Sequence, residues 1–449
     1  MDFLSIRQPF SWQGLGQRSN ADYHFAVKSK TEYSVNNKGK NIMKKHLAKL
    51  AAGFTVAALA ALSMPTTTGA ATTLRIWADA DRKASVEKVA GAWGKKNGVT
   101  VTVVQKDFGK IRDDLKTVDV ATAPDVIVGA HDWVGELAAN GSVIPLTVSK
   151  SASAKIPSYA LDAFSYANAK GNKVLYGAPV ALENVGLVVN TKVAKVPTSF
   201  ADMVSQATAF QKKAAGNFGL VIPGGDAYHN YPLFSGLCGY VFGKDAKGNL
   251  NPDDVGVGNP KLLANAGDVD SWNKSGLLSS KVDYGIAKNA FLAGKAAFWV
   301  TGPWEKDTLD KSGLKVKIVQ MPKNKCDSVP FLGVQGFMVT KFAKSHGVES
   351  QARDLVGSYM LSEGAQTQLS SENGRAPANT DAAAKIDDAL LKQFAAAGKG
   401  GVPMPNIPEM SSVWGDLGTA WTNVFKGADA TPAKTAFRTA GKNIKAKIG

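Results

Sequence analysis

The chain has 449 residues, 44% of them hydrophobic, with 45 glycines, 19 prolines and a formal net charge of +16 at pH 7. This is the composition of a globular protein long enough for two domains, not that of a disordered chain. Residues 1–70 carry +6, from nine Lys/Arg and three Asp/Glu, and the remaining residues carry +10. The later lysines are scattered among acidic residues, which is typical of a solvated surface and disfavours a nucleic-acid-binding protein.

An export signal is predicted at residues 43–70. Residues 43–46 (MKKH) form a basic start, residues 50–62 are an apolar run, and residues 66–71 are small. The apolar run is too short to span a membrane comfortably, which favours cleavage after Ala70 over anchoring. The signal predicts an exported protein, in the periplasm or at the extracellular face. No cysteine lies near the cleavage junction, so lipid attachment there is not expected.

Residues 1–42, ahead of this signal, are polar and rich in Gln, Asn, Lys and Ser. Because a signal peptide normally starts a chain, we expect Met43 to be the true start and residues 1–42 to be a mis-assigned extension. A disordered leader or an unusually long basic region is the alternative.

The exported part contains two cysteines, Cys238 and Cys326. Export makes a disulfide between them permissible. The sequence leaves the pairing open, because it does not show whether the two residues are close in space.

The exported part begins with alternating strands and helices. Strands are expected at residues 74–77, 99–103 and 125–129, and helices over residues 86–97 and 111–118. The first helix carries Val86, Val89, Ala90 and Trp93 on one face and ends near Gly98, a residue suited to a left-handed stop. This rhythm predicts a mostly parallel sheet with helices on both faces.

The pattern restarts after Glu183. Extended segments at residues 178–183 and 186–190 run nearly back to back, which suits a crossing between domains. There follow a helix capped by Thr198 or Ser199, a strand at 218–222, a helix at 286–292 and a buried strand at 296–300. Beyond Pro330 come an extended segment at 331–339 and helices at 352–361 and 387–397. Three prolines argue against regular structure around residues 403–410.

Motifs of several enzyme classes are missing. The sequence contains no phosphate-binding G-x-x-x-x-G-K-[ST] loop, no G-x-G-x-x-G after a strand and no G-x-S-x-G elbow. Its five histidines are dispersed without metal-ligand spacing. These absences count against nucleotide hydrolysis, serine hydrolysis and a zinc site, and we expect no cofactor and no metal.

Carboxylates and aromatic residues recur instead where strands end. They are Asp79, Asp81, Asp132, Trp133, Glu183, Asp226, Tyr228, Tyr231 and Trp304. Each alone is more simply explained as a helix cap, a surface acid or a core aromatic. Ionised carboxylates accept paired hydrogen bonds from hydroxyl groups, and aromatic faces cover the apolar side of a sugar ring. Their joint placement at the ligand-binding edge of open α/β sheets favours a polyhydroxylated ligand.

Several stretches together make the chain resemble the maltose/maltodextrin-binding proteins of ABC importers, from about residue 74 to 449. They are residues 124–127 (PDVI), 130–132 (AHD), 179–183 (PVALE), 254–257 (DVGV), 283–287 (DYGIA), 302–304 (GPW) and 404–410 (MPNIPEM), followed by Trp414. The resemblance implies an α/β, two-lobe periplasmic-binding-protein fold of type II with hinge crossings between the lobes. The strand–helix rhythm that restarts after Glu183 and the extended segment after Pro330 predict one lobe from residues 71–182 and 331–383, and a second from residues 186–330 and 390–449.

The resemblance also implies the positions that contact the sugar. They are Asp79, Asp81, Arg82, Asp132, Glu183, Asp226, Tyr228, Trp304, Met404 and Trp414, and Tyr231 matches a position occupied by a large aromatic. The chain departs from the family at five places. Trp133 replaces an arginine, Gly129 an aromatic, Gly415 a tyrosine, Gly418 an arginine, and Asp226 a glutamate. The departures leave the exact sugar and its length open.

The resulting hypothesis is an exported monomer that captures a maltodextrin-type oligosaccharide and hands it to the membrane subunits of an ABC permease, without covalent chemistry. One alternative is the same fold with a different sugar or solute. Another is a glycoside hydrolase using two of the acids, which would need one carboxyl with a raised pKa and a fixed separation between the pair.

Overall fold

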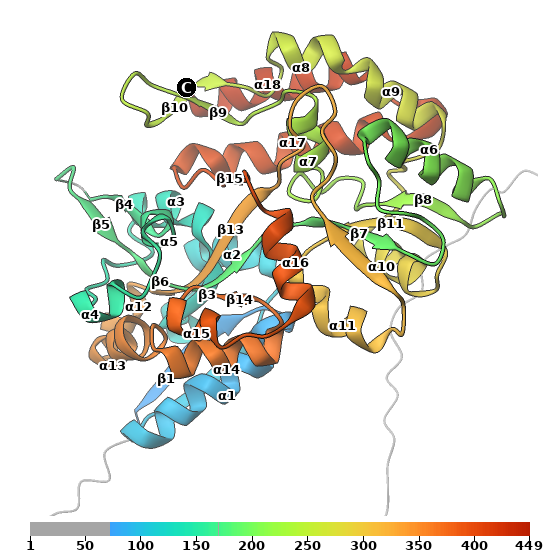
Figure 1. Cartoon of the computed structure of the whole chain (residues 1–449). Helices are drawn as coiled ribbons and strands as arrows, with labels where there is room; N and C mark the ends of the chain where they lie inside the picture. The colour runs from blue at the N-terminus through green and yellow to red at the C-terminus, as the bar shows by residue number, and fades with distance from the viewer. Residues whose placement is uncertain (1–71, 169) are drawn as a thin grey trace, which may run out of the picture. The chain divides into compact units, whose positions relative to one another are not determined.

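The computed structural model describes residues 72–168 and 170–449 (Figure 1). The predicted extension at residues 1–42 and the predicted signal peptide at residues 43–70 lie outside the described residues. Within the described part of the chain, no helix is long and apolar enough to cross a membrane.

A seven-stranded mixed sheet forms one core. Its strand order is β14 (Ala376–Pro377), β6 (Gly177–Glu183), β13 (Phe331–Val339), β3 (Val126–Ala130), β1 (Thr73–Ala78) and β2 (Thr100–Gln105), and β15 (Val402–Pro403) pairs with β13. Strands β1, β2 and β3 are parallel, as predicted from the strand–helix rhythm, whereas β13 is antiparallel to both β3 and β6. The sheet is therefore less parallel than expected, because β13 returns to it from far along the chain.

Helix α1 (Ala80–Asn97) shows why the sequence folds this way locally. Its predicted apolar face is buried, and the Asp79 side chain caps its first turn by accepting from the Arg82 backbone N–H. Gly98 ends the helix with φ of 67°, a left-handed conformation that glycine adopts without strain. The cap leaves Asp79 at the end of β1, where it lines the cavity described below.

A second, four-stranded sheet has the order β12 (Val316–Val319), β7 (Gly186–Asn190), β11 (Ala296–Thr301) and β8 (Phe218–Val221). Every residue of β11 is buried, as its unbroken apolar run predicted. Strand β6 ends at Glu183 in the first sheet and β7 begins at Gly186 in the second, so the chain crosses between the sheets within two residues. Two hairpins, β4 (Ser165–Ala167) with β5 (Lys173–Leu175) and β9 (Phe242–Lys244) with β10 (Leu250–Val255), complete the strands of the described range.

Besides α1, ten α-helices lie before residue 330 in the described part of the chain, some directly after strands and others in succession. They are α2 (Phe108–Thr117), α3 (Val134–Ala139), α4 (Lys150–Ser153), α5 (Ser158–Ala163), α6 (Phe200–Gln211), α7 (Tyr231–Gly236), α8 (Pro260–Asn265), α9 (Gly267–Lys274), α10 (Tyr284–Leu292) and α11 (Lys306–Lys311). Ser199 is the residue that caps α6, since its side chain accepts from the Asp202 backbone N–H.

The tail is largely helical. It contains α12 (Phe342–Ser345), α13 (Glu349–Asp354), α14 (Glu363–Asn373), α15 (Thr380–Ala384), α16 (Ala389–Ala397), α17 (Ser411–Val424) and α18 (Ala433–Ile448). Helices α17 and α18 lie side by side, as do α1 and α14 (Figure 1). The helix predicted at 352–361 is only partly α-helical: α13 ends at Asp354, and a π-helical turn continues it at Leu355–Tyr359. The proline-rich segment contains one 3₁₀ turn, Pro408–Met410.

The structure joins Cys238 and Cys326 in a disulfide. The bond ties the end of α7 to the segment that leads from β12 to β13. Both residues follow the second sheet's first strand, β7, and both precede β13. The disulfide therefore closes a loop within the part of the chain that contains the four-stranded sheet.

Candidate functional site

A cavity of about 730 Å³ lies where strands of both sheets end. Eleven of the twelve residues predicted to bind ligand line it. They are Asp79, Asp81, Arg82, Asp132, Trp133, Glu183, Asp226, Tyr228, Trp304, Met404 and Trp414. A cavity of this size and mixed lining, at the carboxyl ends of strands, is typical of a small-molecule site.

The structure corrects the expectation for Tyr231, which does not line the cavity. Tyr231 is only 3% exposed, and its ring stacks on Phe331 with 3.5 Å between the ring centroids. Tyr231 begins helix α7, whose residues are all buried. Its aromatic character therefore serves packing: Phe331 in turn stacks with the cavity residue Tyr228, at 6.2 Å between centroids.

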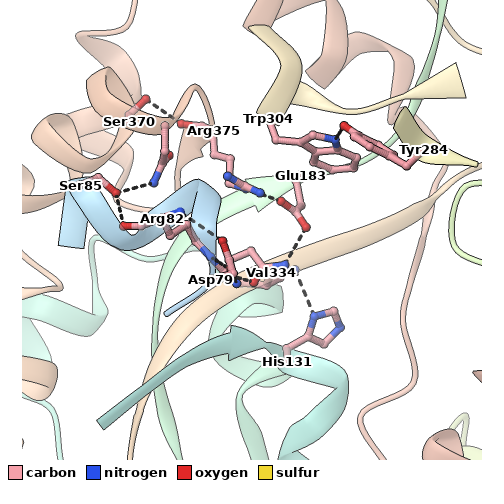
Figure 2. Close-up of polar contacts among 12 residues, drawn as sticks. Asp79, Arg82, Ser85, His131, Glu183, Tyr284, Trp304, Val334, Ser370 and Arg375 are labelled. Atoms are coloured by element: carbon pink, nitrogen blue, oxygen red, sulfur yellow. Dashed lines mark hydrogen bonds and ion pairs between the residues drawn. The ribbon is translucent and has the colours of Figure 1, made fainter. Parts of the chain in front are cut away.

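A chain of buried polar side chains crosses the first sheet (Figure 2). Asp79 pairs with Arg82 on α1, whose Nη1 donates to Gln335 Oε1 at 2.5 Å. Gln335 Nε2 donates to Glu183 Oε1 at 2.6 Å, and Arg375 Nε donates to Glu183 Oε2 at 2.6 Å. Burial alone would raise the pKa of Asp79, but the Arg82 guanidinium outweighs it and lowers that pKa. The network holds ionised acceptors in fixed orientations.

Trp304 is positioned by the chain around it. Strand β11 ends at Thr301, and a 3₁₀ turn at Pro303–Glu305 delivers the half-buried ring to the cavity. A Cβ added to Gly302 would lie 2.2 Å from that ring, so the close approach requires glycine there. The indole Nε1 donates to the Tyr284 hydroxyl at 2.7 Å (Figure 2), and the Arg375 guanidinium lies 5.7 Å from the ring centroid. These contacts fix the half-buried Trp304 ring in the cavity wall, whereas Trp299 is fully buried.

The Asp226 carboxylate accepts hydrogen bonds from the turn that follows it. Its Oδ1 accepts from the backbone N–H groups of Tyr228 and His229 at 2.8 and 3.0 Å, and its Oδ2 lies 2.8 Å from His229 Nδ1. Burial would raise the pKa of Asp226, yet His229 and these hydrogen bonds lower it on balance. The turn places Tyr228 and His229 together on the cavity wall.

Asp132 lies in a 3₁₀ turn at the end of β3, and its Oδ2 accepts from the Trp414 indole Nε1 at 3.0 Å. Burial raises the pKa of Asp132 to about 6, against the opposing effects of the Trp414 hydrogen bond and Arg112. The neighbouring His131 is fully buried, and burial lowers its pKa to about 4, so it is neutral at pH 7. Its Nδ1 accepts from the Val334 N–H at 3.1 Å, and its Nε2 lies 3.0 Å from the Met404 carbonyl oxygen.

Two of the positions at which the chain departs from the maltodextrin-binding pattern, Gly129 and Trp133, are linked, because one side chain fills the space of the other. A Cβ added to Gly129 would lie 2.1 Å from the Trp133 ring, so that ring occupies the space of a side chain at position 129. The aromatic surface expected from residue 129 is therefore supplied from residue 133. The two positions depend on each other sterically, and only the structure reveals it.

Sequence reasoning missed several cavity residues, chiefly Gln335, Arg375, Phe108, His229 and Tyr284. Arg375 precedes the two-residue strand β14, which is too short to give a strand signal.

The Arg375 Nη1, Tyr228 hydroxyl and His229 Nε2 atoms are buried without a protein hydrogen-bond partner in the described structure. Within that same range, no three His, Cys, Asp or Glu side chains converge as metal ligands.

Known proteins resemble this chain in sequence, in structure or in both. A family model described as bacterial extracellular solute-binding protein matches residues 88–397. The galactooligosaccharide-binding protein of Bacillus subtilis (strain 168) is 29% identical over 393 residues, 83% of this chain and 90% of that protein. The maltodextrin-binding protein of the same bacterium is 26% identical over 430 residues, 90% of this chain and 99% of that protein.

Among solved structures, the maltotriose-binding protein of Thermus thermophilus bound with maltotriose aligns with a TM-score of 0.75 at 28% identity. The alignment covers 84% of this chain and 100% of that chain. Together with the two sheets, this likeness confirms the predicted fold class, the α/β two-lobe periplasmic-binding-protein fold of type II.

Proposed function

Because the chain belongs to the family of bacterial extracellular solute-binding proteins, we propose that its solute is a maltodextrin-type oligosaccharide, captured outside the cytoplasmic membrane and delivered to an ABC permease. Relatives named for maltodextrin and maltotriose support this choice of solute. The permease's membrane subunits are the proposed partner, and the proposed state of the exported protein is a monomer in the periplasm or at the extracellular face.

The observation that carries the proposal is the mixed lining of the cavity. Trp304 offers a ring to the apolar face of a sugar, and the Glu183 carboxylate is fixed by Arg375 and Gln335. Sugar hydroxyl groups both donate and accept hydrogen bonds, so they complement the acidic side chains that line the cavity, Asp79, Glu183 and Asp226 among them.

The proposed mechanism is closure of two lobes around the sugar. We assign residues 71–182 and 331–383 to one lobe and residues 186–330 and 390–449 to the other, with the crossing from β6 to β7 as part of the hinge. Asp79 and Asp132 follow strands of the first sheet and Glu183 is the last residue of another, whereas Asp226 and Trp304 follow strands of the second sheet. A ligand that contacts both groups at once favours the closed state over the open one.

Binding without hydrolysis is part of the proposal. Asp79 and Glu183 are engaged in ion pairs with arginines. Asp132 has the raised pKa that a glycoside hydrolase requires of its acid, but its Oδ2 already accepts the Trp414 hydrogen bond. Incubating the protein with maltotriose should release no glucose. Release of glucose over hours in proportion to the maltotriose supplied would establish a glycoside hydrolase instead.

A galacto-oligosaccharide is the second candidate solute, because a relative with that name has 29% identity to this chain. Thermal shifts with maltotriose and with a galacto-oligosaccharide mixture distinguish the two. A ligand at about a hundred times its dissociation constant stabilises the folded state by roughly 2.7 kcal/mol. We expect the larger shift with maltotriose; no shift with either sugar would refute both candidate solutes.

The Trp304→Ala variant tests the site directly. If a sugar ring stacks on Trp304, its removal should weaken maltotriose binding by about 1–3 kcal/mol, by analogy with base stacking, or roughly fivefold to over a hundredfold in Kd. Calorimetric titration measures this change. Tyr159→Ala is the matched control, because Tyr159 is an exposed aromatic outside the cavity lining.

The stability of the unliganded variants separates a platform from a core residue. Trp299, on the same strand–turn unit, is fully buried, and its truncation should cost about 3–5 kcal/mol. Trp304→Ala should cost clearly less in chemical denaturation. Unchanged maltotriose affinity with a Trp299-like loss of stability would show that Trp304 is a core residue.

A further inference from the structure

Phe108 is a large apolar residue that remains exposed inside the cavity. It is the first residue of α2, directly after the cap Asp107, and 38% of its surface is exposed. Its ring lines the cavity together with Trp133. An exposed aromatic ring at a concave polar site offers apolar contact area to a ligand.

The Phe108 ring is supported from behind. Its centroid lies 4.9 Å from that of Trp133, with 40° between the ring planes, and 4.9 Å from the Arg82 guanidinium carbon. Trp133 is itself held against Gly129, and Arg82 is anchored by Asp79 and Gln335. Phe108 and Trp133 therefore form a pre-positioned aromatic pair, which needs little reordering to receive a ligand.

The strand order places this pair away from Trp304. Trp304 lies against Arg375, which comes directly before β14 at one edge of the seven-stranded sheet. Trp133 follows β3 and Phe108 follows β2, and β2 is the opposite edge strand. Strands β14 and β3 are three places apart in the order, a separation of roughly 14 Å at the usual spacing of neighbouring strands. One sugar ring is too short to contact both places.

We infer that Phe108 and Trp133 form a second ring-binding platform, so that the cavity selects oligosaccharides of at least three sugar rings over disaccharides. This rests on the proposed function and names a chain-length preference for the same site. One ring stacks at Trp304, a distant ring covers the exposed face of Phe108, and at least one ring lies between them. A disaccharide reaches only one platform and gains nothing from the other.

The test compares maltose with maltotriose and maltotetraose in calorimetric titrations of wild type, Phe108→Ala and Phe108→Trp. Phe108→Ala should raise the Kd for maltotriose or maltotetraose by roughly fivefold or more, the scale of one lost stacking contact. Its Kd for maltose should stay within about twofold of wild type. Phe108→Trp, which keeps an aromatic face, should retain most of the preference for longer chains.

Tyr159→Ala removes an exposed aromatic ring outside the cavity lining and controls for nonspecific effects. Equal Kd changes for maltose and the longer sugars, or none for any of them, would overturn the second platform while leaving the proposed function intact. A wild-type protein that bound none of the three sugars would overturn both. Thermal unfolding of the unliganded variants confirms that each is folded, as expected for a partly exposed residue.

Discussion

Glu183→Ala should lower the free energy of unfolding by about 3–5 kcal/mol, because it leaves Arg375 buried without its carboxylate partner. The side chains of this pair are only 7% and 8% exposed, and 192 residues separate them in the chain. Burial would lower the pKa of Arg375, but Glu183 outweighs that effect and raises it, so the guanidinium stays charged. Chemical denaturation of the unliganded protein measures the loss.

Two further variants make this result specific. The pair Lys173–Asp162 is exposed on both sides, so Asp162→Ala should change stability by less than about 1 kcal/mol. Removing both charges, as Glu183→Ala with Arg375→Met, should restore much of the lost stability, since no unpaired charge remains. A double variant no more stable than Glu183→Ala alone would show that packing, and not the buried charge, causes the loss.

Asp132→Asn should make the protein more stable than wild type at pH 7.5, by on the order of 3 kcal/mol, and this advantage should vanish near pH 4. Burial raises the folded-state pKa of Asp132 to about 6, from an ordinary value of 3.8. A raised pKa means that the folded state favours the protonated acid. The wild type therefore loses stability as the pH rises from about 4 to about 6, and the destabilisation persists above that range.

The asparagine keeps an oxygen that can accept the Trp414 hydrogen bond, so the comparison isolates the charge. Asp79 and Asp226 act in the opposite sense, because their lowered pKa values stabilise the fold until the pH falls through them. That contribution is common to both proteins and cancels in their difference. Denaturation of both at several pH values between 4 and 7.5 gives the curve; a difference that does not vary with pH would contradict a raised pKa.

Local sequence patterns were enough to predict most elements and many of the acidic and aromatic residues of the cavity. The apolar spacing of α1, its end at Gly98 and the unbroken apolar run of β11 each depend on neighbouring residues. Strand ends were equally readable, and Trp304 and Asp132 were placed in the cavity on that basis. These features could be predicted because helix caps, glycine turns and side-chain periodicity act over a few residues.

The tertiary structure alone decided which distant residues meet. It paired Arg375 and Gln335 with Glu183, joined Cys238 to Cys326, and turned Tyr231 into the core.

It also set Phe108, which follows the edge strand β2, against Trp133, which follows β3. The strand order of the first sheet brings Phe108 to Trp133, and the return of β13 to that sheet brings Gln335 to Glu183. No local pattern encodes such contacts, because they arise only when segments far apart in the chain pack together.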